Sequence, residues 1–209
     1  MKKRIFFATL LTMCMLGAQN IMAQAVETTK YDDGRVYVGQ RNGKGKIHGQ
    51  GMMTWPNGDR YEGQWAKGNQ HGEGTYTWAN GLVYQGQWVK NVIKGHGVFR
   101  FPNGNVMEGD WNGLGTGTGI LTWSDGTRYE GPFLNGAPQG QGVKTWPNGD
   151  RYEGNFVQGH MSGYGTLTSK GGMSYTGGWV NDQFEGKGKY VGADGTVLEG
   201  TFRAGKYQE

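Results

Sequence analysis

The chain has 209 residues, of which 42 are glycine, about one in five against a typical ~7%. Its aromatic content of 13% is too high for a disordered linker, and five prolines are too few for a collagen-like chain, so we expect a folded protein. The formal net charge of +4 and the pI of about 9.1 suggest nucleic-acid binding only if the mature protein keeps the basic residues.

The segment 1–25 has the pattern of a secretory signal peptide. A basic start at Lys2-Lys3-Arg4 precedes an apolar run at 5–16, and Ala23-Gln24-Ala25 supplies small residues for signal peptidase. This run is too short to cross a bilayer, which takes ~20 apolar positions. We therefore expect export to the periplasm, the cell envelope or the outside, without a permanent transmembrane anchor.

Removal of this signal changes the charge and the thiol content. Without Lys2, Lys3 and Arg4 the chain keeps 18 basic and 17 acidic residues, so we expect no nucleic-acid partner. The single cysteine, Cys14, lies in the signal, and Met13 before it is too bulky for a lipoprotein signal. A mature protein without a thiol has no disulfide, no cysteine-ligated metal and no cysteine nucleophile.

A pair of glycines with the pattern Gly-x-Gly recurs at a fixed interval. Successive pairs begin at Gly49, Gly72, Gly95, Gly117, Gly140, Gly163 and Gly186, which gives intervals of 23, 23, 22, 23, 23 and 23. A second column, mostly tyrosine, runs in step with the pairs: Tyr37, Tyr61, Tyr84, Met107, Tyr129, Tyr152, Tyr175 and Leu198. Two columns in step indicate a repeat array.

Each period predicts a β-hairpin. The segments 61–65 and 74–78 alternate with period two, as strands do. Between two such strands lies Trp55-Pro56-Asn57-Gly58-Asp59, whose proline, asparagine and glycine favour a turn. The other connection, 65–72, is expected to be longer and to join one hairpin to the next.

These residues resemble the MORN repeat, whose pattern is Tyr-Glu-Gly-x-Trp followed by a Gly-x-Gly strand that ends near aromatic-Pro-Asn-Gly. The resemblance covers about residues 31 to 205. Two copies carry the motif most clearly: Tyr61, Glu62, Gly63, Trp65, Gly72, Gly74 and Trp78 in one, and Gly140, Gly142, Trp146, Tyr152, Glu153 and Gly154 in another. We expect a signal peptide at 1–25, a lead-in strand that caps the array at 26–36, the array at 37–197 and a partial C-terminal repeat at 198–209.

The resemblance implies an all-β fold, an elongated single-layer meander of antiparallel hairpins with about seven repeats. Two strands per repeat give a pitch of ~10 Å. Glycines would leave room for the tyrosine and tryptophan rings of neighbouring hairpins to lie over the backbone. Pro132 occupies a strand position and cannot donate to a ladder, so we expect an irregular hairpin there.

The carboxylates and histidines are interpreted as structural. Arg60, Arg128 and Arg151 each stand two positions before a glutamate, which predicts a ladder of exposed ion pairs rather than one catalytic pair. Equivalent residues of successive repeats are ~10 Å apart, too far to share a zinc ion. We therefore expect turn residues at His48, His71, His96 and His160. The turns at Asp59 and Asp150 offer too few oxygens for calcium.

No motif for nucleotide binding or acyl transfer occurs: the sequence lacks G-x-G-x-x-G, G-x-x-x-x-G-K-[ST] and G-x-S-x-G. MORN arrays accompany some lipid kinases and methyltransferases, but the signal and the repeats leave no residues here for such a catalytic domain. We expect no enzymatic activity, no cofactor and no metal.

Charge is distributed unevenly along the array. Residues 41–100 contain eight basic and three acidic residues, whereas residues 101–209 contain eight basic and eleven acidic ones. A basic surface of this kind attracts anionic lipid headgroups, and the asymmetry also suits pairing of two arrays as a homodimer. We expect the lysines of the connections to form the interaction surface: Lys44, Lys46, Lys90 and Lys94.

The sequence thus favours an exported scaffold that presents a repetitive sheet surface to protein partners or to an anionic membrane surface. The alternative is binding of envelope polysaccharide by the aromatic face. Polysaccharide binding requires a row of exposed rings, whereas a scaffold can bury most of its rings against glycine.

Overall fold

The structure, a computed structural model, describes residues 4–5 and 25–209. The predicted signal peptide at 1–25, with Cys14, lies outside the described residues except for Arg4, Ile5 and Ala25. The chain divides into two compact units, Met1–Pro102 and Asn103–Glu209.

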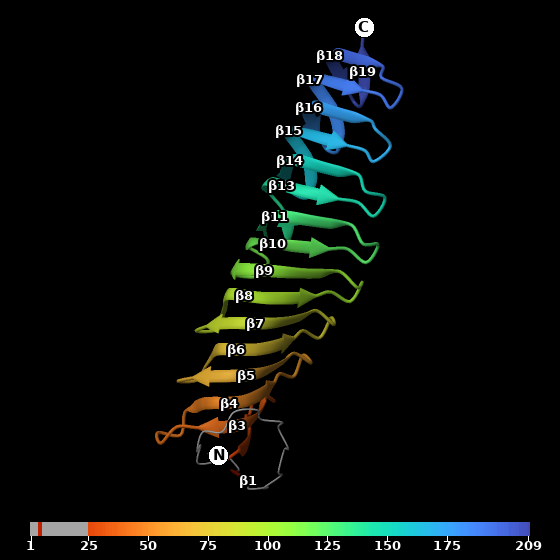
Figure 1. Ribbon diagram of the computed structural model, residues 1–209. Coiled ribbons are helices and arrows are strands. Elements are labelled where there is room, and N and C mark those ends of the chain that lie inside the picture. The colour runs from red at the N-terminus through yellow and green to blue at the C-terminus, as the bar shows by residue number, and fades with distance from the viewer. Residues whose placement is uncertain (1–3, 6–24) are drawn as a thin grey trace, which may run out of the picture. The chain divides into compact units, whose positions relative to one another are not determined.

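In the first unit each strand pairs antiparallel with the next along the chain, and Figure 1 shows β3 to β8 in chain order. The strands are β1 (Arg4–Ile5), β2 (Glu27–Lys30), β3 (Val36–Arg41), β4 (Ile47–Thr54), β5 (Arg60–Ala66), β6 (Asn69–Thr77), β7 (Val83–Val89) and β8 (Val92–Arg100). The expected lead-in at 26–36 contains β2 and the turn before β3.

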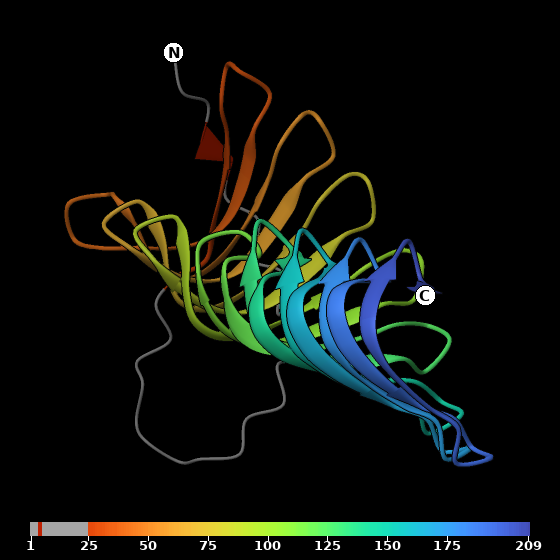
Figure 2. The same ribbon diagram turned by 90° about the horizontal axis from the view of Figure 1, so that it is seen from above.

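The second unit repeats the same plan. Its strands are β9 (Val106–Asn112), β10 (Gly117–Thr122), β11 (Arg128–Leu134), β12 (Ala137–Pro138), β13 (Gly140–Thr145), β14 (Arg151–Val157), β15 (His160–Thr168), β16 (Ser174–Val180), β17 (Gln183–Val191), β18 (Val197–Arg203) and β19 (Lys206–Gln208). Most of β18 and all of β19 lie in the segment 198–209. The strands of this unit, green to blue in Figure 2, are curved along their length.

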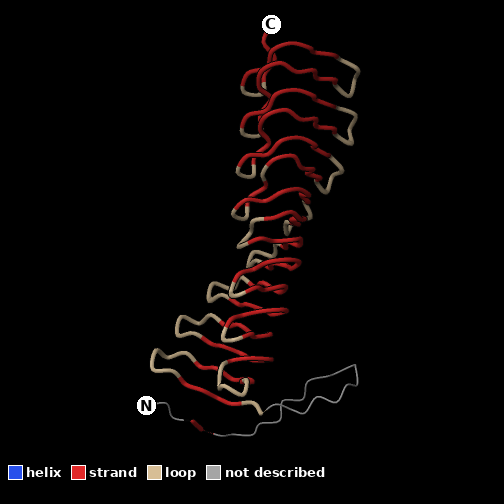
Figure 3. Tube along the Cα trace, turned by 90° about the vertical axis from the view of Figure 1, so that its left-hand side faces the viewer, coloured by secondary structure: helices blue, strands red, loops and turns tan. Residues whose placement is uncertain are grey.

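The predicted all-β meander of antiparallel hairpins is confirmed in each unit. Strands and loops account for all of the described residues, and Figure 3 shows no helix among them. Accordingly, the part of the chain that is described contains no helix of the length and hydrophobicity needed to span a bilayer.

The two kinds of connection differ from the expectation. The connection expected to be long is a two-residue turn, Lys67-Gly68, because the ladder continues through the pairs Trp65 with Gln70 and Ala66 with Asn69. The connection with the Pro-Asn-Gly motif is the longer one and covers five residues, 55–59. Gly58 takes a φ of +94° in it, and the Gly58 amide donates to the Trp55 carbonyl at 3.0 Å.

Tyrosine rings packed over glycines form the core, as predicted. The tyrosines of the repeat column have 0% exposure: Tyr37, Tyr61, Tyr84, Tyr129, Tyr152 and Tyr175. A Cβ atom on Gly74 would lie 2.2 Å from the Tyr61 hydroxyl, and one on Gly142 would lie 2.5 Å from the Tyr129 ring. Trp65 packs edge-on against Tyr61 with ring centroids 5.0 Å apart.

Proline interrupts the ladder where the sequence predicts it. Opposite Pro132, the partner of β11 is split into β12 and β13 on either side of Gln139. The Pro132 carbonyl still accepts hydrogen bonds from the Gln139 amide at 2.9 Å and from the Tyr129 hydroxyl at 3.0 Å. The irregularity therefore follows from the missing proline N–H.

The predicted arginine–glutamate ladder is also present. Arg60 pairs with Glu62, Arg128 pairs with Glu130 at 2.9 Å, and Arg151 pairs with Glu153 at 2.7 Å. All of these side chains are roughly half exposed, so each pair contributes only about 0–1 kcal/mol.

The prediction that the histidines are turn residues is wrong. His48, His71 and His96 lie inside β4, β6 and β8, and His160 is the first residue of β15. The strands extend up to the two-residue turns, so positions expected in a long connection belong to the ladder. In the described residues, no three His, Cys, Asp or Glu side chains converge to hold a metal ion.

Candidate functional site: a basic turn edge

Four exposed lysines lie in successive connections on one edge of the first unit: Lys44, Lys46, Lys67 and Lys90. We call this set the basic turn edge. It consists of the loop between β3 and β4, the turn between β5 and β6, and the turn between β7 and β8. Neighbouring connections are separated by two strands, so the set spans ~20 Å.

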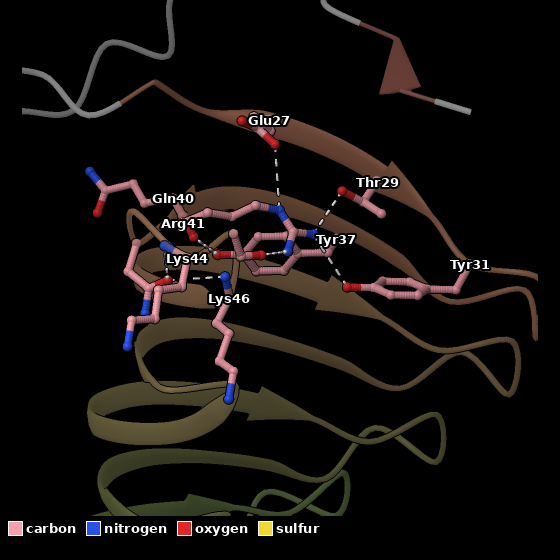
Figure 4. Close-up of polar contacts among 10 residues, drawn as sticks. Glu27, Thr29, Tyr31, Tyr37, Gln40, Arg41, Lys44 and Lys46 are labelled. Carbon is pink, nitrogen blue, oxygen red and sulfur yellow. Dashed lines mark hydrogen bonds and ion pairs between the residues drawn. The ribbon is translucent and has the colours of Figure 1, made fainter. Parts of the chain in front are cut away.

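The first connection is a loop that is ordered by its own polar groups. Asn42 Oδ1 accepts hydrogen bonds from the amides of Lys44 at 3.0 Å and Lys46 at 3.1 Å. The Arg41 guanidinium donates to the Gly45 carbonyl at 2.7 Å. In Figure 4 the side chains of Lys44 and Lys46 extend away from these contacts. The backbone is thus held while both ammonium groups remain exposed.

Arg41 fastens the loop to the strand at the start of the unit. Its guanidinium donates to Thr29 Oγ1 at 2.8 Å, lies 3.5 Å from a Glu27 carboxylate oxygen, and sits 5.3 Å from the centre of the Tyr37 ring (Figure 4). The Arg41 side chain is only 14% exposed. Arg41 is therefore a positioning residue, whereas the lysines carry the accessible charge.

Lys67 and Lys90 occupy an unfavourable backbone conformation. Their φ angles are +54° and +50°, in the left-handed region, where asparagine and glycine are preferred. The equivalent positions of the second unit hold Asn135, Gln158, Asn181 and Ala204. A residue other than glycine or asparagine in this position costs of order 1 kcal/mol.

Hydrogen bonds between neighbouring hairpins fix the position of these turns. The Gly68 amide donates to the Ile47 carbonyl at 2.8 Å, and the Asn91 amide donates to the Gln70 carbonyl at 3.1 Å. Asn91 Oδ1 accepts from the Gln70 amide at 2.8 Å. Each turn is therefore tied to the hairpin before it, and the lysines keep a constant spacing.

The structure brings together three of the four lysines proposed from the sequence. Lys44, Lys46 and Lys90 lie on the basic turn edge. Lys94 lies instead on β8, exposed on the sheet face opposite the buried rings, because the connection before it is only two residues long. The sequence reasoning missed Lys67, although its position relative to the tyrosine column is the same as that of Lys90.

The aromatic side chains divide into two groups. The central rings are buried, among them Trp65 at 5% and Trp88 at 5% exposure, so these columns do not form an exposed row. The aromatic residues at the five-residue turns are half-buried: Trp55, Trp78, Phe101, Trp123 and Trp146. This second group leaves ring surface for a ligand, and outside both groups Tyr164 and Tyr207 are also exposed.

The repeat pattern is matched by a family model, that of the MORN repeat. Its seven matches cover residues 43–60, 61–83, 84–106, 108–128, 129–151, 152–174 and 175–197. The chain belongs to the MORN repeat family. Most of the matched repeats correspond to a pair of strands with one five-residue turn and one two-residue turn; the connection between β9 and β10, residues 113–116, is longer.

Comparison with known proteins adds little to this family assignment. No curated protein matches the sequence. Among solved structures, the SAS-4 (dCPAP) TCP domain of Drosophila melanogaster, in complex with a proline-rich motif of Ana2 (dSTIL), has 13% identity and a TM-score of 0.44, covering 78% of this chain and 96% of its own. The G-box domain of the microcephaly protein CPAP has 17% identity and a TM-score of 0.48, covering 83% and 97%. With TM-scores this low, these domains support no statement about what the MORN array binds.

Proposed function

We propose that this MORN protein is an exported, non-catalytic scaffold whose basic turn edge binds a negatively charged surface. The observation that carries the proposal is the presence of lysine at the left-handed position of two successive turns, Lys67 and Lys90, in line with Lys44 and Lys46. The turn geometry favours asparagine or glycine there. Gln158 and Ala204 occupy the same position in the second unit, so the charge of the two lysines, rather than the conformation alone, is the feature that we attribute to binding.

The repeat architecture supports a scaffold rather than an enzyme. A catalytic pair requires two groups held together in one special environment, whereas successive MORN repeats place equivalent side chains ~10 Å apart. The same spacing suits multivalent contact, in which several weak interactions act together.

The charge of the basic turn edge suits two sources of negative charge: an anionic membrane surface or an acidic patch on a protein partner. A lysine near an anionic bilayer contributes about 1 kcal/mol. Four such residues on one edge suffice for reversible attachment that weakens as salt rises. A second copy of the chain is a further acidic partner, through residues 101–209.

Export is proposed from the sequence of the segment 1–25. The basic start, the short apolar run and the small residues at 23–25 all favour a cleaved signal peptide. The scaffold would then act in the periplasm, at the cell envelope or outside the cell.

Vesicle co-sedimentation of the mature protein tests the binding proposal. The test variant K44Q/K46Q/K67Q/K90Q removes the basic turn edge, and the control variant K170Q/K187Q/K189Q/K206Q removes the same charge from the second unit. We expect the parent and the control to bind vesicles rich in phosphatidylserine at low salt, and the test variant to lose most binding. If no variant binds vesicles, affinity capture from envelope extracts with the same three proteins tests the protein-partner form. Equal behaviour of test and control in both assays would refute a role for the basic turn edge.

A further inference from the structure

A lysine interrupts an otherwise apolar column on the ring face of the sheet. Lys144 lies on β13, opposite Tyr129 and Tyr152 of the adjacent strands. The positions equivalent to Lys144 in the other repeats hold Met53, Tyr76, Phe99, Leu121, Leu167 and Tyr190. A charged residue at a position that elsewhere holds apolar or aromatic side chains is the kind of local exception that functional sites produce.

The Lys144 ammonium group lies between two indole rings. Its Nζ is 5.3 Å from the ring centre of Trp123 and 5.0 Å from that of Trp146. Both tryptophans stand at the start of five-residue turns and are half-buried. One cation thus faces two partly open aromatic surfaces.

The equivalent site in the first unit contains a carboxylate that the site around Lys144 lacks. There Tyr76 lies between Trp55 and Trp78, at centroid distances of 5.5 and 4.5 Å, and its hydroxyl donates to Asp59 Oδ2 at 2.8 Å. The residue that corresponds to Asp59 beside Lys144 is Thr127, which is buried and neutral. The cation therefore has no carboxylate at the position where the phenol has one.

Within residues 25–209, the Lys144 ammonium forms neither a hydrogen bond nor an ion pair. It makes cation–π contacts with the two indole rings. The Lys144 charge acts on the Asp125 carboxyl without direct contact. Hydrogen bonds from Thr127, and to a smaller extent the Lys144 charge, lower the pKa of the Asp125 carboxyl, and the Thr127 amide donates to Asp125 Oδ1 at 2.8 Å. A half-buried cation without an anion in direct contact is suited to bind one from a ligand.

We propose that Trp123, Lys144 and Trp146 bind a linear polysaccharide that contains uronic acid. The C–H faces of two sugar rings would stack on the indoles, and the carboxylate between them would pair with the Lys144 ammonium. Successive five-residue turns are ~10 Å apart, close to the length of a disaccharide, so one carboxylate per two sugars matches one lysine per pair of indoles.

Two other classes of polymer fit this site less well. A peptide commonly binds by adding a strand to a sheet edge, but β13 is paired on both sides, with β11 and β14. A nucleic acid needs many cations, whereas residues 101–209 contain eight basic and eleven acidic residues. A ligand of low charge density with flat apolar faces remains, which describes a uronate polysaccharide.

Calorimetric titration with a panel of uronate hexasaccharides and their carboxyl-reduced, neutral forms tests the proposal. The parent should bind at least one uronate hexasaccharide with a Kd below about 1 mM and prefer it to the neutral form. Lys144→Met introduces the residue type of position 53, so we expect the fold to be retained; it should weaken binding at least tenfold and abolish that preference. Trp146→Ala should weaken binding of both forms, and its melting temperature reports whether it folds.

Matched variants separate this site from the basic turn edge. K44Q/K46Q/K67Q/K90Q should bind the hexasaccharide like the parent, and Lys144→Met should bind anionic vesicles like the parent. Unchanged saccharide affinity of Lys144→Met overturns the proposal, as does failure of the parent to bind any hexasaccharide of the panel. Stronger, Lys144-dependent binding of a polyglutamate peptide would assign the site to acidic peptides instead.

Discussion

The Tyr61 hydroxyl donates a hydrogen bond to the Gln64 carbonyl, three residues later in the same strand, at 2.9 Å. The ladder between β5 and β6 shifts register between Gly63 and Trp65, next to this carbonyl. The same bond recurs in five other repeats, from Tyr37, Tyr84, Tyr129, Tyr152 and Tyr175. A tyrosine in this column thus supplies a hydrogen bond that phenylalanine could not.

Tyr61→Phe should therefore destabilise the protein although the ring is retained. The part-buried hydrogen bond to the Gln64 carbonyl would be lost, at a cost of about 1 kcal/mol. Chemical denaturation checks this, with Tyr164→Phe as control because Tyr164 is 63% exposed. Identical unfolding midpoints for the two variants would contradict the role of the hydroxyl.

Gly74→Ala should destabilise by roughly 1–3 kcal/mol, because the added Cβ would lie 2.2 Å from the Tyr61 hydroxyl. Gly43→Ala is the matched control, since no atom lies within 4 Å of a Cβ at that position. Thermal unfolding compares the two. A loss of stability of the same size in both variants would contradict the role of ring contact, because the backbone entropy effect of Gly→Ala is stabilising.

The protein should lose stability in alkaline solution. Burial raises the pKa of Tyr84, Tyr129 and Tyr152 to about 12, above the ordinary value of about 10. Because the unfolded chain ionises first, the tyrosines contribute stability that is fully present below about pH 10 and is lost as pH rises to about 12. Urea unfolding across this range, with ultraviolet detection of tyrosinate, measures the loss. Ionisation of these tyrosines at their ordinary pKa in the folded protein would disprove it.

Replacing Lys67 and Lys90 by asparagine should stabilise the protein and weaken its attachment to anionic vesicles. Asparagine tolerates the left-handed turn position better than lysine, so we expect a gain of about 0.5 kcal/mol per site. Melting temperature and vesicle co-sedimentation are measured on the same double variant. A variant that is no more stable than the parent would remove the argument that lysine is kept there against the backbone preference.

The mature protein should begin near Gln24 to Val26, as the proposed signal peptide requires. Mass spectrometry of the protein from its natural source identifies the first residue and, after fractionation, the compartment. Recovery of intact Met1 from the cytoplasm would refute export.

The sequence predicted the fold better than it predicted the candidate site. The glycine and tyrosine columns define the period, and period-two alternation identifies the strands on either side of Pro56. Alternation does not show where a strand stops, however, so the segment around Lys67 and Gly68 was expected to be a long connection. That error placed Lys94 in a connection. Lys67 lies inside the connection expected at 65–72 but was not included in the predicted basic surface.

The site around Lys144 was missed for a different reason. Its neighbours Trp123 and Trp146 lie one full repeat apart in the chain, and nothing in the spacing predicts that the ammonium lies between their rings. Aligning the residue two positions before each turn aromatic would have shown one lysine among apolar and aromatic side chains. This alignment can be made from the sequence, but the register of β11, β13 and β14 is needed to place Lys144 near the two indole rings.

At the first position of each two-residue turn, the backbone conformation is the same whatever the side chain is. Lys67, Lys90, Asn135, Gln158, Asn181 and Ala204 all adopt one conformation there, although their side chains share no chemistry. The residue at the first position of each turn can therefore be replaced, one turn at a time, without repacking an aromatic ring. Within each unit the fold thus fixes the spacing of these positions, whereas the side chain at each position is free to vary.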